Sequence, residues 1–300
     1  MKQEMGEVEL IVDMGDLCGE CPIWEPDLSQ LYWTDIAGRN FQRYSPDLNR
    51  YELLHHGLEI NGFALKEGGG FVITNSHGVW RWDGVNEPTS VLTEIEGHRC
   101  RLNDCIADPV GRLLTGSWHY DPNAEYELGK LISVDVDGRS SILDEGIHGS
   151  NGLAFSSDQK TLYFADSVLR TIYAYDYDLE HGTVANRRVV VKLAPEEGVP
   201  DGLTVDSESF LWSAQWYGGC VIRYDPDGHV ERRIALPAKQ ISSLTFGGMD
   251  LSDIYITSAR SDGPTPLRPR NYDPTTGTVG GALYRVSTNI RGVHEFRCLV

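Results

Sequence analysis

Six polar side chains recur along the chain at one position of a repeating motif, and all six carry a side-chain oxygen. Each precedes a short apolar run of the kind seen in "NGLAF", and the members are Glu20, Asn61, Asn103, Asn151, Asp201 and Ser242. Carboxylate and amide oxygens are typical ligands of hard divalent cations, whereas softer metals prefer thiolate or imidazole. Two carboxylates brought close together also repel one another unless a cation or a proton compensates their charge. If the fold gathers these residues, they predict a divalent-metal site; the alternative is that each one caps its own turn.

The spacing of the six residues indicates what could gather them. Successive members lie 41, 42, 48, 50 and 41 residues apart. Each is followed by a second apolar run, such as "TLYFADS", and most units have a third run that ends near an aromatic residue and a turn, such as "TIYAYDYD". The runs are short, rich in β-branched and aromatic residues, and bounded by Gly, Pro, Asp and Ser, which is typical of β-strands.

Six such units, each with room for four strands, predict an all-β fold: a six-bladed β-propeller with four-stranded antiparallel blades around a central channel. A TIM barrel would need a helix after every strand, and the turns here are too short for one. We expect residues 1–300 to form a single domain. The N-terminal "EVELIVDM" should close the ring beside "GALYRV" of the last blade, because an open ring would expose a strand edge. Equivalent positions then repeat around the axis, so the six oxygen-bearing residues should ring one end of the channel.

Composition narrows the possible partners and the compartment. The formal net charge of -18 disfavours binding to nucleic acid or to an anionic membrane surface. The sequence has no apolar stretch long enough for a transmembrane helix and no signal-peptide pattern at its start, so we expect a cytoplasmic protein that does not bind membranes. A Cys18-x-x-Cys21 pair could be a redox pair or half of a zinc site, but Cys100 and Cys105 are too loosely spaced to be the other half of such a site. The sequence contains no G-x-S-x-G segment, so it gives no sign of a serine nucleophile of that kind.

Several long segments resemble the regucalcin-like family, also called the senescence-marker-protein/gluconolactonase family. They run from about residue 19 to residue 260 and include "GECPIWEPDLSQLYWTDI", "RLNDCIADPVGRLLTGS", "SNGLAFSSDQKTLYFADS" and "PDGLTVDSESFLWSAQWYGGCVIRYDPDG". The resemblance implies one divalent metal cation in the channel (calcium, magnesium, manganese, zinc or iron(II)), with Glu20, Asn151 and Asp201 as ligands. It places Asn103 beside the metal as a substrate contact or fourth ligand, Arg101 as a substrate contact, and Asp201 as the catalytic base.

The function implied by this resemblance is hydrolysis of a small-molecule sugar-acid lactone. A divalent cation polarises the lactone carbonyl and lowers the pKa of water, and a neighbouring carboxylate can accept the proton. Two alternatives use the same site: a phosphotriesterase-like hydrolase, and a calcium-binding propeller without enzymatic activity. The sequence departs from the family pattern at Cys21 and Cys105, where glycine is common, and after "TGS", so it does not specify the sugar.

Histidines and aromatic residues near the expected rim are weaker candidates. His119 and His148 could shuttle protons, although an ordinary loop position explains each of them as well. Aromatic side chains follow the second strand of two units and could stack on a sugar ring or pack between blades: Trp118, Tyr120, Trp216 and Tyr217.

Overall fold

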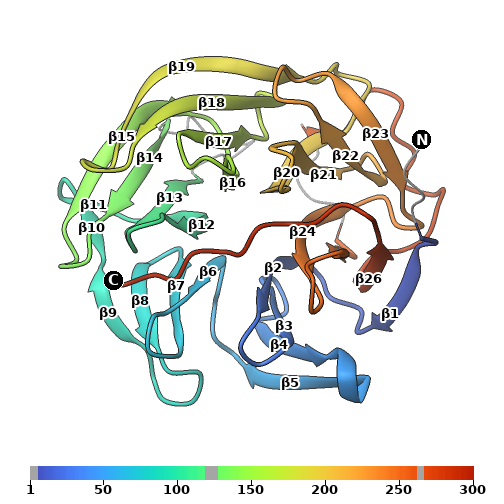
Figure 1. Cartoon of the computed structure of the whole chain (residues 1–300), viewed down its shortest axis with the longest axis horizontal. Coiled ribbons are helices and arrows are strands. Elements are labelled where there is room, and N and C mark those ends of the chain that lie inside the picture. The colour runs from blue at the N-terminus through green and yellow to red at the C-terminus, as the bar shows by residue number, and fades with distance from the viewer. Residues whose placement is uncertain (1–5, 119–127, 262–266) are drawn as a thin grey trace.

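Six four-stranded antiparallel sheets are arranged around a central axis (Figure 1), which confirms the predicted six-bladed propeller. The computed structural model describes residues 6–118, 128–261 and 267–300. His119 and Tyr120 therefore lie outside the described residues. The described residues include a short 3₁₀ turn, η1 (Pro46–Leu48), and none of their helices is long and apolar enough to cross a membrane.

Each blade is a meander whose first strand lies nearest the axis. The first blade contains β2 (Gly19–Glu25), β3 (Gln30–Asp35), β4 (Asn40–Ser45) and β5 (Arg50–His56). The second contains β6 (Gly62–Leu65), β7 (Phe71–Asn75), β8 (Gly78–Trp82) and β9 (Thr89–Leu92). The third contains β12 (Leu102–Ala107), β13 (Leu113–Ser117), β14 (Gly129–Val134) and β15 (Ser140–Ile147). A two-stranded ribbon, β10 (Glu94–Ile95) and β11 (His98–Arg99), precedes the third blade.

The other three blades repeat this order. The fourth blade contains β16 (Ser150–Phe155), β17 (Thr161–Asp166), β18 (Thr171–Asp178) and β19 (Thr183–Lys192). The fifth contains β20 (Val199–Val205), β21 (Leu211–Trp216), β22 (Cys220–Tyr224) and β23 (Val230–Ala235). The sixth contains β24 (Ile241–Gly247), β25 (Asp253–Ser258), β26 (Ala282–Ser287) and β1 (Glu9–Asp13). Burial decreases from the axis outward: all residues of β20 and β24 are buried, whereas most of β19 is exposed. The second and third runs of the repeat thus pack one blade against the next.

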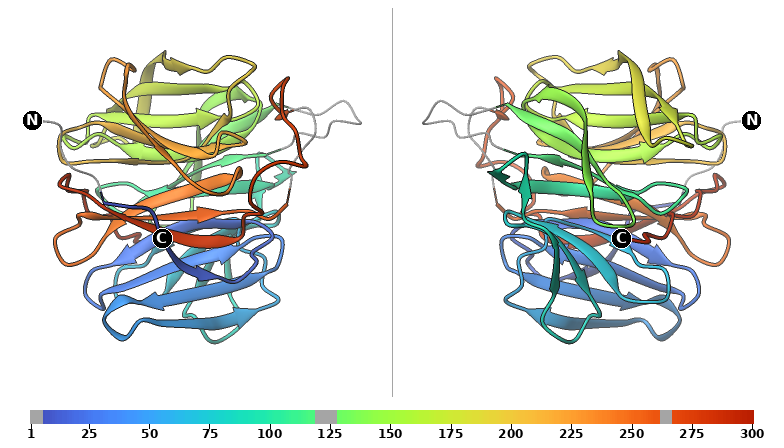
Figure 2. Two further views of the ribbon diagram at one scale, coloured as in Figure 1. Left: turned by 90° about the vertical axis from the view of Figure 1, so that its right-hand side faces the viewer. Right: turned by 90° about the vertical axis from the view of Figure 1, so that its left-hand side faces the viewer.

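The two ends of the chain meet in the sixth blade. Strand β1 pairs antiparallel with β26, with Glu9 opposite Arg285, and these two side chains form an ion pair of 2.7 Å. Figure 2 shows from the side that the N-terminal strand, in blue, lies against the red C-terminal strands. The outer strand of the last blade therefore comes from the start of the chain.

Residues 288–300, which we call the C-terminal strap, cross one face of the ring (Figure 1). Its backbone bonds to several blades in turn: Gly292 N donates to Leu251 O (2.9 Å), and Leu299 N donates to Gly111 O (2.8 Å). Glu295 and Phe296 of the strap line a cavity of about 40 Å³ that all six inner strands also line. The cavity therefore lies in the channel, and the strap closes this end of it.

Gly152 is required by close packing between inner strands and not by a turn, since Asn151-Gly152 lies inside β16. A Cβ atom at Gly152 would stand 2.4 Å from Leu203 N and 2.5 Å from Asp201 O of the next inner strand. Both contacts are with backbone, which cannot move aside cheaply.

We expect Gly152→Ala to lower the free energy of unfolding by about 1–3 kcal/mol, the usual cost of overpacking a close contact. Chemical denaturation of the variant and of the wild type in the same buffer measures the difference. An unchanged unfolding midpoint would show that the inner strands can separate to admit a methyl group.

Candidate metal centre

The six oxygen-bearing residues lie at the start of the six inner strands, where the sheet is locally irregular. Glu20 pairs with Thr34 and Ile23 with Tyr32, so β2 advances three residues while β3 advances two. The same extra residue occurs at this point in β12, β16, β20 and β24. A β-bulge bends the strand and redirects its side chains. The repeated bulge therefore turns the leading polar residues of these strands toward the end of the channel opposite the strap.

The amide groups of this ring bond from one blade to the next. Asn61 Nδ2 donates to Leu102 O and Asn103 Nδ2 donates to Ser150 O, each at 2.8 Å. In both pairs the acceptor is the backbone of the following inner strand. Because the amide nitrogens are held in this way, the amide oxygens remain available to the axis.

Ser167 supplies the corresponding link for Asn151. Its hydroxyl donates to Pro200 O at 2.6 Å, so it can only accept from Asn151 Nδ2, which lies 3.2 Å away. Ser242 makes the analogous bond to Gly19 O across the junction with the first blade. Ser167 was not among the residues selected from the sequence, although it ends the run "TLYFADS" directly after β17.

The two carboxylates of the ring meet in the gap between these amide links. Glu20 and Asp201 are only 6% and 3% exposed, and their carboxyl groups are close enough to affect each other's pKa. Glu20 Oε2 also accepts from Cys21 N (3.1 Å), while Asp201 Oδ1 is buried without any hydrogen-bond partner among the described residues. A buried carboxylate oxygen without a partner is costly, so it indicates that a group is missing.

The environment of this pair opposes full ionisation. Burial raises the pKa of Glu20 to about 8, and the Asp104 carboxylate adds to the rise. Burial, followed by the charges of Glu20 and Asp104, raises the pKa of Asp201 well above its usual range. The two groups therefore hold at least one proton between them near neutral pH. A bound divalent cation would replace that proton.

The donor set fits a hard cation. Glu20, Asp201, Asn151 and Asn103 border one cavity and offer carboxylate and amide oxygens. The orphaned Asp201 oxygen gives such an ion a direct ligand. Calcium, magnesium and manganese all favour oxygen ligands of this kind.

An apolar wall surrounds the cavity above these four residues. The cavity has a volume of about 320 Å³, and its wall is formed by Cys18, Ile36, Ala37, Trp118, Val199, Trp216 and Leu267. Trp118 and Trp216 thus line the cavity, whereas Tyr217 packs against Tyr272 with ring centroids 4.8 Å apart. Ser167 and Ser261 also line the cavity, and the most deeply buried of its polar groups are Glu20, Asp201 and Ser167.

Arg101 does not border this cavity but a second one beside it. The second cavity has a volume of about 410 Å³ and shares Ile36, Asn103 and Trp118 with the first. The Arg101 side chain is exposed. Arg101 and the metal candidates therefore belong to neighbouring compartments that meet at Asn103.

The other metal and proton-transfer candidates lie elsewhere. Cys18 is in the cavity wall, and Cys21 Sγ bonds to Asn61 O (3.3 Å) and Asp104 Oδ1 (3.2 Å). The two thiols are thus in different surroundings and do not form half of a zinc site. His148 N donates to Asp166 Oδ2 (2.9 Å), and His148 does not line either cavity.

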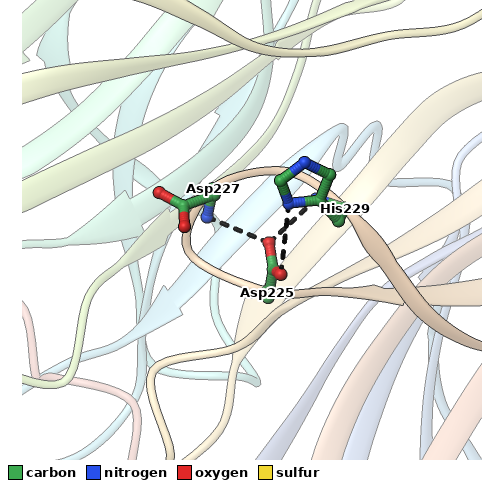
Figure 3. Close-up of side chains that lie close together, drawn as sticks. All are labelled: Asp225, Asp227 and His229. Atoms are coloured by element: carbon green, nitrogen blue, oxygen red, sulfur yellow. Dashed lines mark hydrogen bonds and ion pairs between the residues drawn. The ribbon is translucent and has the colours of Figure 1, made fainter.

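Asp225, Asp227 and His229 form a surface group whose possible ligand atoms all lie within 4.8 Å of one another (Figure 3). Asp225 Oδ1 accepts from the backbone of Asp227 (3.0 Å) and of His229 (2.8 Å), which holds the turn between β22 and β23. These hydrogen bonds and the nearby His229 side chain keep the pKa of Asp225 below its usual range. Turn formation accounts for this group without an ion.

We expect Ser167→Ala to weaken divalent-metal binding by about tenfold or more, because Asn151 loses the hydroxyl that orients it. Isothermal titration calorimetry of metal-stripped protein measures the effect. Ser157→Ala is a matched control, since Ser157 is an exposed residue whose hydroxyl contacts Ser209. Equal affinities in the two variants would show that Asn151 is oriented without Ser167.

Comparison with known proteins gives consistent matches over almost the whole chain. Residues 18–260 match the family described as SMP-30/Gluconolactonase/LRE-like region. The chain is 35% identical over 292 residues to pentonolactonase XacC of Haloferax volcanii, covering 97% of both chains. It is 34% identical to regucalcin of Danio rerio, covering 84% of this chain and 86% of the relative. A solved luciferin-regenerating enzyme superposes with a TM-score of 0.86 at 29% identity, covering 98% of this chain and 99% of that one.

Proposed function

Since the chain belongs to the SMP-30/gluconolactonase/LRE-like family, we propose that it is a divalent-metal-dependent lactonase that opens the cyclic ester of a sugar acid. The names of its relatives support a lactonase, and pentonolactonase XacC is 35% identical over nearly the full length of both chains. The metal dependence, the sugar and the residue roles are our own proposals.

The observation that carries the metal dependence is the buried, unpartnered Asp201 oxygen beneath an open cavity. Glu20, Asn151 and Asp201 would hold the cation, with Asn103 beside it. A bound divalent cation would polarise the lactone carbonyl and lower the pKa of water.

Asp201 is our candidate for the general base. Its carboxylate lies at the cavity floor, and its Oδ1 is not committed to any hydrogen bond among the described residues. With Oδ1 on the cation, the second carboxylate oxygen of Asp201 would accept the proton of the attacking water. Glu20 is bonded to the Cys21 backbone and serves mainly as a charged ligand.

The remaining cavity residues would orient the substrate. Trp118 and Trp216 offer aromatic faces on which the C–H face of a sugar ring can stack. Arg101 can donate to substrate hydroxyls from the neighbouring compartment. The apolar wall would exclude water from the ester while the floor supplies the polar groups.

The test is proton release from a panel of 1,4- and 1,5-aldonolactones, with and without a chelator. We expect turnover that the chelator abolishes and that several divalent ions restore, because an all-oxygen site selects by size and charge more than by softness. A phosphotriester in the same panel tests the phosphotriesterase alternative. Metal binding without turnover of any lactone would instead indicate a calcium-binding propeller that is not an enzyme.

A further inference from the structure

A row of side chains leads away from the candidate metal centre along the segment before β12. Cys100 and Leu102 are buried in the core, at 3% and 1% exposure, whereas Arg99 and Arg101 are exposed. This alternation is that of an extended chain, in which every second side chain points to the same face. Arg99 and Arg101 thus point away from the core, and the whole segment from Arg99 to Asn103 lines the second cavity.

In the described part of the chain, the two arginines in this row have no ion-pair partner, although Glu94 stands opposite Arg99 in the β10–β11 ribbon. Among the described residues, neither guanidinium forms a hydrogen bond or an ion pair, although the chain carries 44 acidic and only 26 basic residues. Other arginines are paired: Arg43 binds Glu52 at 2.6 Å and Arg112 binds Asp108 at 2.8 Å. Arg39 and Arg81 are also unpaired among the described residues, so what distinguishes Arg99 and Arg101 is that both line the same cavity.

The second cavity has the composition of an anion-binding compartment. His77 joins the two arginines, Asn61 and Ser76 add neutral polar groups, and no carboxylate is among the described residues that line it. Guanidinium groups bind carboxylate and phosphate groups through two parallel hydrogen bonds. We call His77, Arg99 and Arg101 the basic compartment.

We propose that the basic compartment binds an anionic substituent of the substrate, so that the preferred lactone carries a carboxylate or a phosphate away from its ester. This inference rests on the proposed lactonase function. The second cavity meets the first at Asn103, so a lactone bound at the metal centre could extend its far end toward the arginines. Arg101 would reach the anion first, and Arg99 would complete its binding.

The test compares three lactones of the same sugar: the neutral aldonolactone, its analogue with a terminal carboxylate, and its analogue with a terminal phosphate. We expect kcat/KM for at least one anionic lactone to exceed that for the neutral one by about tenfold, chiefly through KM. The preference should decrease as salt is raised, because added ions screen the arginines. The two anionic arms identify which anion the compartment accepts.

Arg99→Gln should reduce the ratio of kcat/KM between the anionic and the neutral lactone by about fivefold or more. Arg139→Gln is the matched control, since it removes the same charge from a side chain that is 82% exposed on a surface turn, and it should leave the ratio unchanged. Hydrolysis of the neutral lactone without any preference for an anionic one would overturn this inference and leave the lactonase intact. Absence of turnover with all three lactones would overturn both proposals. An equal loss in the two variants would show that only net charge matters.

Discussion

Asp201→Asn is expected to reduce kcat by about 10²-fold or more, even at saturating metal, because the substitution removes the proposed general base. The asparagine keeps the shape of the side chain and one oxygen ligand, so the cation can still bind, although less tightly. Asp201 is the ring carboxylate with an uncommitted oxygen at the cavity floor, whereas Glu20 accepts a backbone hydrogen bond. Steady-state kinetics on the best lactone of the panel, over a titration of metal, measures the effect.

Asn151→Asp is the matched control for this prediction. Like Asp201→Asn, it exchanges an amide and a carboxylate in one residue of the ring. Unlike Asp201→Asn, it adds a negative charge and leaves the proposed base in place. We expect this variant to bind metal at least as tightly as the wild type and to retain activity. If Asp201→Asn turns over normally once metal saturates, Asp201 acts only as a ligand. The base would then be Glu20, or no side-chain base would be needed.

Metal affinity is expected to increase by about tenfold per pH unit up to about pH 8, for each proton that the cation displaces. The pKa of Glu20 is about 8 in the folded protein, so below that pH the incoming cation must compete with a proton. The pKa of Asp201 is raised as well, which acts in the same direction. Calorimetric titration of metal-stripped protein at pH 6, 7 and 8 measures the dependence directly, and buffers of different ionisation enthalpy report the number of protons released.

The same groups predict an opposite trend for the stability of the metal-free protein. A carboxyl group whose pKa is raised by folding stabilises the folded state below its unfolded pKa, and this contribution is lost as pH rises through the folded pKa. For Glu20 the loss should extend from about pH 4.5 to about pH 8. Denaturant unfolding of the metal-free protein should therefore show falling stability over this range, and saturating metal should reverse the fall. Glu20→Gln should flatten both trends, and parallel curves for wild type and variant would contradict this assignment.

The fold was predictable because the motif of a polar residue followed by a short apolar run recurs along the sequence at a nearly constant period. Aligning the six leading polar residues gave the number of blades and the identity of each inner strand. The same register grouped Glu20, Asn103, Asn151 and Asp201, which border one cavity in the structure. In a closed ring of similar units, equivalent residues must lie at equivalent distances from the axis.

Features that belong to only one blade were not predictable in this way. Ser167 orients Asn151 through a bond to the next blade, and nothing in the repeat singles out a serine at the end of a second strand. The C-terminal strap follows the last repeat and has no equivalent in the other units. Its role depends on contacts with Leu65, Gly111 and Leu251, which are distant in sequence.

The departure at Cys21 has a conformational explanation. Its φ of 49° lies in the left-handed region, where glycine has no steric penalty, and this accounts for the glycine common at this position in the family. In this chain the thiol bonds to Asn61 O and to Asp104, which holds the residue in place. The backbone geometry next to Glu20 is thus maintained by a different side chain.

The C-terminal strap covers one end of the central channel, so the channel is open mainly at the other end. Glu295 and Phe296 lie at the far end of the channel, where the cavity is only about 40 Å³, so a ligand that reaches Asp201 from the larger cavity has little room to leave on that side. Substrate would then enter, and the ring-opened acid would leave, through the same mouth. The acid would then occupy the place that the next lactone needs, so its inhibition should be competitive. A lactone attached to a bulky carrier could still react if its linker fits the mouth, whereas a long chain threaded through the ring could not be a substrate.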